Sequence, residues 1–291
     1  MTNTHSDTSG ENAKSLRVYR PDSRFGAGLF GGVAALAREV LDYRSHIATI
    51  FRNDFRASYR GTALGVVWNF FLPILPITVY VLLVNLRVFP AREGIPAAVY
   101  IGFNVLLWFL FTGLINQPIQ VVRSRNAEVM KTAMPLSAAI ASSFARLCFD
   151  TLVRTVFVAA LVILTGAAVK VSAVALAPIV IAGATLFLGV GFLLSILNAI
   201  FPDVDRFVTI VLQYGIFLSG VIFPLSSIKS LAFLEWANPF AVFIHAARAV
   251  VFEGALPHPL AFWTWTAAGA LLLVAAARFF YVMEYRVRGL S

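Results

Sequence analysis

Long runs of hydrophobic residues alternate with short polar stretches over most of the chain, and this pattern predicts membrane helices. Six such runs are present, at about 62–86, 97–122, 136–167, 173–200, 207–223 and 259–282. A helix needs about 20 apolar residues to cross the hydrocarbon core, with a range of roughly 17 to 25. Pro73 and Pro76 predict a kink in the first run, because proline interrupts the hydrogen bonds of a helix. The runs therefore predict an all-α polytopic membrane protein with six transmembrane helices.

The segment before the first run is amphipathic with helical spacing. Apolar and aromatic residues recur at every fourth position beside a stripe of cations; the apolar stripe is Tyr43, Ile47, Phe51, Phe55 and Tyr59, and the basic stripe is Arg44, Arg52, Arg56 and Arg60. This pattern predicts a helix over 36–61 at the cytoplasmic membrane interface, with its cations near anionic head groups. A soluble linker helix would have the same pattern. Residues 1–35 are predicted to form a disordered tail.

The stretch at about 225–257 is rich in apolar residues but is interrupted too often to cross a membrane. Charged residues and an Asn-Pro pair break it, namely Lys229, Glu235, Asn238, Pro239, Arg248 and Glu253. Two half-helices that meet at Asn238 and Pro239 and dip into the membrane from one side fit this pattern. Irregular backbone at membrane depth is tolerated only where protein buries it or water lines it. The alternative is a surface loop with an amphipathic helix.

Composition and charge exclude several classes of protein. The chain is 59% hydrophobic and only 13% charged, against about 25% charged in soluble domains, which excludes an ordinary soluble enzyme. The net charge of +9 reflects membrane topology rather than nucleic-acid binding, because 16 cations fall on the predicted cytoplasmic segments and five on the outer ones. The positive-inside rule then places both termini in the cytoplasm, including a short tail at 286–291. The single cysteine, Cys148, excludes a disulfide framework, and the spacing of the four histidines favours structural or titrating roles over metal ligation.

Two polar features could carry function. Arg146, Asp150 and Arg154 share one face of the third run, because they are spaced four residues apart. They predict either a charged row along a translocation path or a self-neutralising structural ladder. The polar stretch 123–131 lies between two predicted spans on the cytoplasmic side. It is either a short helix that presses into a soluble partner or an ordinary loop.

The motifs of common enzymes are missing from the sequence. There is no Gly-Lys pair and therefore no P-loop, so the chain has no route to ATP through that motif. Zinc-protease, paired-cysteine and G-x-S-x-G patterns are also missing. The sequence therefore favours a transport subunit that has no catalytic residues, cofactor or metal of its own.

Four motifs in order resemble the ABC-2-type permeases that export polysaccharides, over about residues 36–285. The motifs are Arg56-Ala-Ser-Tyr-Arg60-Gly-Thr-Ala-Leu-Gly65-Val-Val-Trp68 with Pro73, the 126–135 segment, Phe201-Pro202-Asp203-Val204-Asp205-Arg206, and Phe223-Pro224-Leu225 followed by Asn238-Pro239-Phe240 and Arg248. The resemblance implies a permease domain over 62–285 and a homodimer in a bacterial cytoplasmic membrane. It further implies two separate ATPase subunits that bind ATP and Mg²⁺, and a lipid-linked O-antigen, capsule or teichoic-acid glycan as the cargo. A permease for a drug or a lipid, or a stand-alone channel or secondary carrier, is the alternative.

The resemblance also implies roles for individual residues. Contact with the ATPase would fall to Arg123, Arg125, Asn126, Glu128 and Lys131, beside the interface-helix residues Arg52, Arg56 and Arg60. The channel would be lined by Trp68, Trp108, Arg146, Asp150 and Arg154, with the two tryptophans stacking on sugars and Arg146 meeting the lipid head group. Tryptophans that anchor the helices at the membrane surface are the alternative. The outer gate would contain Phe223, Pro224, Asn238, Pro239 and Arg248.

Overall fold

The computed structural model describes residues 28–59, 94–124 and 134–288, together with 75, 77–79, 81–83 and 85–88. These residues form helices and connecting turns, and none of them is in a strand. The longer helices are α1 (Leu29–Asp42), α2 (Arg44–Tyr59), α4 (Ala97–Ser124), α6 (Leu136–Thr165), α7 (Leu176–Ile200), α8 (Asp203–Gly215), α10 (Pro239–Phe252) and α11 (Pro259–Arg288). The short ones are η3 (Val171–Ala175), η4 (Ile216–Leu218), η5 (Leu225–Ser227) and α9 (Leu234–Ala237).

Four helical segments are long and apolar enough to cross a membrane. They are Ala97–Ser124, Leu136–Thr165, Val171–Ile200 and Pro259–Glu284. At about 1.5 Å per residue, even 26 residues extend about 39 Å, which exceeds a hydrocarbon core of about 30 Å. These four predicted spans are confirmed as helices of spanning length. The first predicted span lies largely outside the described residues.

The fifth predicted span is shorter than the hydrophobic run that suggested it. Helix α8 ends at Gly215, and after η4 the chain turns at Gly220, whose φ of +66° lies in the left-handed region. Thirteen helical residues extend only about 20 Å. The continuous helix predicted over 207–223 is therefore wrong, because glycine and the following Pro224 end it. The total of six spans stays a prediction.

Helices α4, α7 and α11 pack closely because glycines remove side chains from their contacts. A Cβ atom built on Gly189 would lie 2.9 Å from the backbone nitrogen of Leu273 in α11, and one on Gly191 would meet the carbonyl oxygen of Leu114 in α4. Glycines of α7 therefore face both α4 and α11. Phenylalanines fill the centre of this core, where Phe187 contacts Phe111 and Phe240.

The N-terminal helices differ from the single helix predicted over 36–61. Helix α1 begins at Leu29 and α2 follows after a bend at Tyr43. The predicted start at residue 36 is wrong, because the apolar residues before it pack on α11: a Cβ on Gly32 would lie 2.6 Å from the Cα of Arg278. The aromatic stripe of α2 reaches α6, where the ring centroids of Phe55 and Phe149 are 4.9 Å apart. Residues 1–27 lie outside the described residues.

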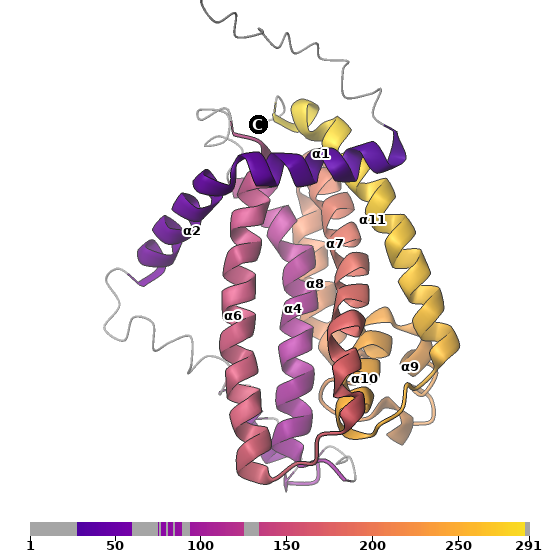
Figure 1. Ribbon diagram of the computed structural model, residues 1–291. Coiled ribbons are helices and arrows are strands. Elements are labelled where there is room, and N and C mark those ends of the chain that lie inside the picture. The colour runs from indigo at the N-terminus through magenta and orange to yellow at the C-terminus, as the bar shows by residue number, and fades with distance from the viewer. Residues whose placement is uncertain are drawn as a thin grey trace, which may run out of the picture.

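The bundle has two distinct ends, which Figure 1 shows. Helix α1 lies across one end, here called the α1 end, where α4 finishes, α6 begins, α7 connects to α8, and α11 finishes. At the opposite α10 end lie α9, α10, the α6–α7 connection and the start of α11. The two ends of the described chain therefore lie at the same end of the bundle.

The interrupted stretch 225–257 contains one buried helix rather than two equal halves. The break falls at Asn238, as predicted, but α9 before it has only four residues. Helix α10 buries most of its residues, including the fully enclosed Phe243 and Ile244. A surface amphipathic helix is therefore the wrong description of α10, and its depth in a membrane stays a prediction.

Candidate functional site: a polar hollow with fixed ends

A polar hollow of about 370 Å³ opens between α4, α6 and α8. Its polar lining comes from three helices and includes Thr112, Asn116, Gln117, Asp150, Arg154 and Gln213. Four of these residues escaped the sequence analysis: Thr112, Asn116 and Gln117 in the second run and Gln213 in the fifth. A signal for two of them was present, because Thr112, Asn116 and Gln120 are spaced four residues apart. Charged and amide side chains therefore face this hollow from the middle of α4 and α6.

The predicted charged row of α6 follows this hollow. The Arg146 Nε lies 4.0 Å from the Asp150 Oδ2, and the Arg154 guanidinium lies 4.8 Å from the ring centroid of Phe109. Among the described residues, the buried Arg154 Nε has no hydrogen-bond partner. Asp150 lies between the two arginines of the row, and Arg154 in addition rests on an aromatic ring. The two interpretations of the row, translocation path and structural ladder, both stay predictions.

Arg146 extends the polar surface toward α2. It lines a second hollow of about 440 Å³ together with Asp54 of α2 and Gln117, Ser142 and Ser143. Gln117 belongs to both hollows, so they adjoin at this residue. A polar groove therefore runs from the contact between α2 and α6 to the face of α8.

Trp108 is buried in the core and is not exposed to a transported molecule. Its side chain is 4% exposed, and its ring centroid lies 4.6 Å from that of Phe240. Trp108 is nevertheless one of the residues that line the hollow. This position favours packing over the predicted stacking on a sugar. Trp68 lies outside the described residues.

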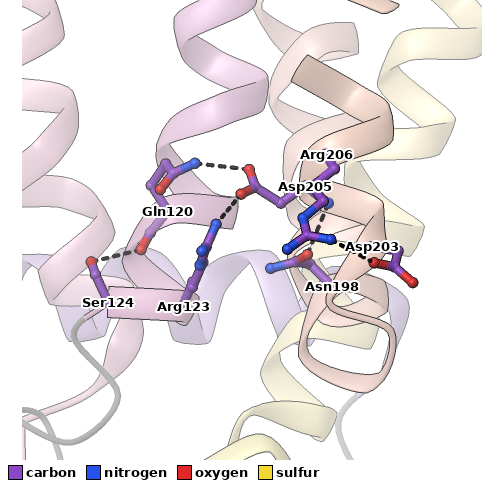
Figure 2. A network of polar contacts seen from close by, with 7 residues as sticks. All are labelled: Gln120, Arg123, Ser124, Asn198, Asp203, Asp205 and Arg206. Atoms are coloured by element: carbon purple, nitrogen blue, oxygen red, sulfur yellow. Dashed lines mark hydrogen bonds and ion pairs between the residues drawn. The ribbon is translucent and has the colours of Figure 1, made fainter. Parts of the chain in front are cut away.

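At the α1 end, a buried carboxylate ties α8 to α4 (Figure 2). Asp205, in the first turn of α8, is 5% exposed and pairs with the Arg123 guanidinium. Gln120 donates a hydrogen bond from Nε2 to the Asp205 Oδ1 over 2.8 Å, and the Asp205 backbone N–H donates to the Asn198 Oδ1 over 2.9 Å. The carboxylate also lies at the positive end of the α8 dipole. Arg123, predicted to contact an ATPase, is thus engaged within its own chain.

Two further carboxylates fix the beginning of α6. The Leu136 backbone N–H donates to the Glu284 Oε1 of α11 over 2.6 Å, and the Ser137 hydroxyl donates to the Glu39 Oε2 of α1 over 2.5 Å. Glu284 is fully buried. Unpaired N–H groups at a helix start favour negative charge. Sequence analysis missed Glu39 and Glu284, because their partners lie about 100 or more residues away in the chain.

The segment between the end of α4 and the beginning of α6 contains most of the predicted ATPase contacts. Arg125, Asn126, Glu128 and Lys131 lie outside the described residues, as does Arg60 of the interface helix. Arg52 and Arg56 are described and exposed on α2. The helix ends on either side of this segment are both held by carboxylates. Asp205 of α8 binds the end of α4, and Glu39 of α1 and Glu284 of α11 bind the beginning of α6.

At the α10 end, the predicted gate residues lie together. Arg248 is 3% exposed, and its Nη1 donates to the Asn104 Oδ1 over 3.3 Å. Asn104 in turn donates to the carbonyl oxygen of Val221 over 3.0 Å. The Arg248 guanidinium lies 4.6 Å from the ring centroid of Tyr100, and its Nε lies 3.8 Å from the Glu253 Oε1. This buried cation joins α10, α4 and the turn after η4.

Asn238 joins the same turn to the start of α10. Its Oδ1 accepts a hydrogen bond from the Phe240 N–H over 3.0 Å, and its Nδ2 donates to the Leu218 carbonyl over 2.8 Å. Pro239 occupies the first turn of α10, where its missing N–H costs nothing. Phe223 and Pro224 are buried in the turn itself. Hydrogen bonds and burial therefore hold the turn after η4 against the start of α10.

Comparison with known proteins agrees with this architecture. Residues 45–252 match the family model described as ABC-2 type transporter. The chain is also 26% identical over 253 residues to the O-antigen export system permease protein RfbA of Myxococcus xanthus, across 84% of this chain and 95% of that protein.

Proposed function

We propose, from the premise that this chain belongs to the ABC-2 type transporter family, that it is the membrane subunit of an ATP-driven exporter of a lipid-linked polysaccharide. Permeases of this family are transport components, and the ATPase is a separate subunit. The observation that carries the choice of cargo is the similarity, along most of the chain, to a permease named for O-antigen export. Capsule and teichoic-acid glycans belong to the same chemical class.

The polar groove is the proposed path for the cargo. A glycan with an anionic lipid carrier needs both amide hydrogen-bond partners and cations, and charged groups at membrane depth usually face such a cavity. Asn116, Gln117 and Gln213 supply amides, while Arg146 and Arg154 supply the cations. Among the described residues the groove is open on one side, which supports a homodimer in which a second copy contributes to the wall.

The α1 end is the proposed cytoplasmic side, in a bacterial cytoplasmic membrane. The excess of cations on the segments that meet there supports this orientation. Two ATPase subunits, which bind ATP and Mg²⁺, would dock there against α2 and the connection from α4 to α6. The exposed Arg52 and Arg56 are suited to contact an acidic surface on such a subunit.

The cargo is tested by removing this protein from its native bacterium. We expect surface glycan to disappear and its lipid-linked precursor to accumulate on the inner face of the membrane, with recovery when the wild-type chain is returned. Export of a drug or a membrane lipid would leave the glycan unchanged, and that result would refute the proposed cargo. Purification in mild detergent with native mass measurement tests the assembly, for which two permeases and two ATPases are expected.

Arg154→Gln tests the proposed path separately from the fold. Because the guanidinium has one described aromatic contact and a buried Nε without a hydrogen-bond partner among the described residues, we expect folding to persist and export to fall several-fold. Arg206→Gln is the matched control, since Arg206 forms only an exposed pair with Asp203. Equal export by both variants would exclude Arg154 from the path.

A further inference from the structure

Three side chains from three successive elements converge at the α10 end. Glu235 comes from α9, His245 from α10 and His258 from the turn before α11. One ligand atom from each lies within 4.8 Å of the other two. Their sequence separations gave no sign of a metal site, because helix packing rather than a local motif brings them together.

The geometry of this cluster is close to that of a tetrahedral metal site. With bonds of about 2.1 Å, neighbouring ligands in a tetrahedral zinc site lie about 3.4 Å apart. The His258 Nε2 and the Glu235 Oε2 are already 3.5 Å apart. All three ligand atoms lie within 4.8 Å of one another, so an approach of at most about 1.4 Å completes the set.

The surroundings hold the ligands without blocking access. The Ser226 N–H donates to the second carboxylate oxygen of Glu235 over 2.9 Å, leaving Oε2 directed at His258. The Glu235 side chain is 14% exposed, whereas that of His258 is 43% exposed, so an ion can arrive from the solvent side. His258 adopts a φ of +46°, an uncommon conformation that turns the chain just before α11.

The donor set determines the class of ion. Two imidazoles and one carboxylate are the ligands of many zinc sites, with water as the fourth ligand. Calcium and magnesium prefer oxygen ligands instead. The buried Arg248 lies beside the same small cavity as Glu235 and His245, but Glu253 is 3.8 Å from its Nε and offsets its charge.

We propose that Glu235, His245 and His258 bind a zinc-like divalent cation. A bound ion would link α9, α10 and the start of α11, three elements at the α10 end (Figure 1). The site would stabilise that end of the bundle, and its existence does not depend on which cargo the protein carries.

The test is metal binding by the full chain in detergent, purified through an affinity tag that contains no histidine. Zinc bound per chain is measured by equilibrium dialysis followed by elemental analysis, in a Cys148→Ser background that removes the exposed thiol. We expect one zinc per wild-type chain and at least a tenfold weaker affinity in Glu235→Gln and His258→Ala. His46→Ala on the exposed face of α2 is the matched control and should bind like wild type.

A second measurement guards against variants that fold poorly. Zinc should raise the thermal unfolding temperature of the wild type and of His46→Ala, and should leave that of Glu235→Gln and His258→Ala unchanged. Unaltered zinc binding in those two variants, or no zinc bound by a folded wild-type chain, would overturn the proposal. In either case the cluster would be a hydrogen-bonded group at the end of the bundle.

Discussion

The pairing of Asp205 with Arg123 predicts how firmly α8 is fixed to the end of α4. Replacing Asp205 by Asn keeps an oxygen for Gln120 but removes the charge that meets the guanidinium. A hydrogen bond to a charged group contributes about 1.5–3 kcal/mol, and an exposed ion pair only about 0.2–1 kcal/mol. The Asp205 side chain is 8% exposed and that of Arg123 is 61% exposed, so the pair lies between these limits. We expect Asp205→Asn to lower the free energy of unfolding by about 1–2 kcal/mol.

The same helix turn supplies the control. Asp203 is 93% exposed and lies 3.7 Å from an exposed arginine, so Asp203→Asn should lower stability by less than about 1 kcal/mol, the contribution of the helix dipole and an exposed pair. Arg123→Gln should cost at least as much as Asp205→Asn, because it leaves a buried carboxylate without its cation. In the double variant the two losses should not add, because both substitutions remove the same contact.

Reversible unfolding in mixed micelles, followed by tryptophan fluorescence, measures these differences. The double-mutant cycle then isolates the interaction between the two side chains. Equal stability of Asp205→Asn and Asp203→Asn would refute the reasoning. So would strictly additive losses for Asp205→Asn and Arg123→Gln.

Two further stability predictions follow from close contacts. Gly191→Ala should lower stability by about 1–3 kcal/mol, since its Cβ would meet the Leu114 carbonyl, whereas Gly28→Ala has open space and should not. Asn238→Ala should cost about 1–2 kcal/mol, because it removes both the cap of α10 and the bond to the turn after η4, while Asn53→Ala on exposed α2 should be neutral. Thermal unfolding in detergent checks each pair, and equal losses within a pair would contradict the contact that motivated it.

The hydrophobic pattern predicted the long helices well because it reports burial in lipid or protein over many residues. It failed over 207–223, where apolar residues continue past the point at which the backbone turns. Hydropathy carries no information about backbone conformation. The chain changes direction at Gly220 because this residue adopts a positive φ. The interface helix was predicted to begin at residue 36, whereas α1 begins at Leu29. The sequence could not show this, because the contact of Gly32 with α11 exists only in the folded chain.

The candidate site was only partly predictable for a different reason. Arg146, Asp150 and Arg154 stand out because charges are rare in apolar runs, and the structure directs them into a hollow. Amides such as Gln117 and Gln213 do not stand out in the same way. Nor do Glu235, His245 and His258, which belong to three separate elements. Proximity between distant segments depends on packing, which no single segment encodes.

Helix α4 connects the sites because its polar residues wind around it. Asn104, Thr112, Asn116 and Gln120 are separated by multiples of four residues, over about 24 Å of helix. Each step of four advances about 40° beyond a full turn, so the stripe rotates by about 160° from its first member to its last. This rotation brings Asn104 to Arg248 and the turn after η4, Thr112 and Asn116 to the hollow, and Gln120 to Asp205. Burying polar groups is unfavourable unless each finds a partner, and the winding lets Asn104 and Gln120 bond to different elements. One helix therefore contacts the turn after η4, the groove and α8, so that Arg248 and Asp205 are held by residues of the same helix.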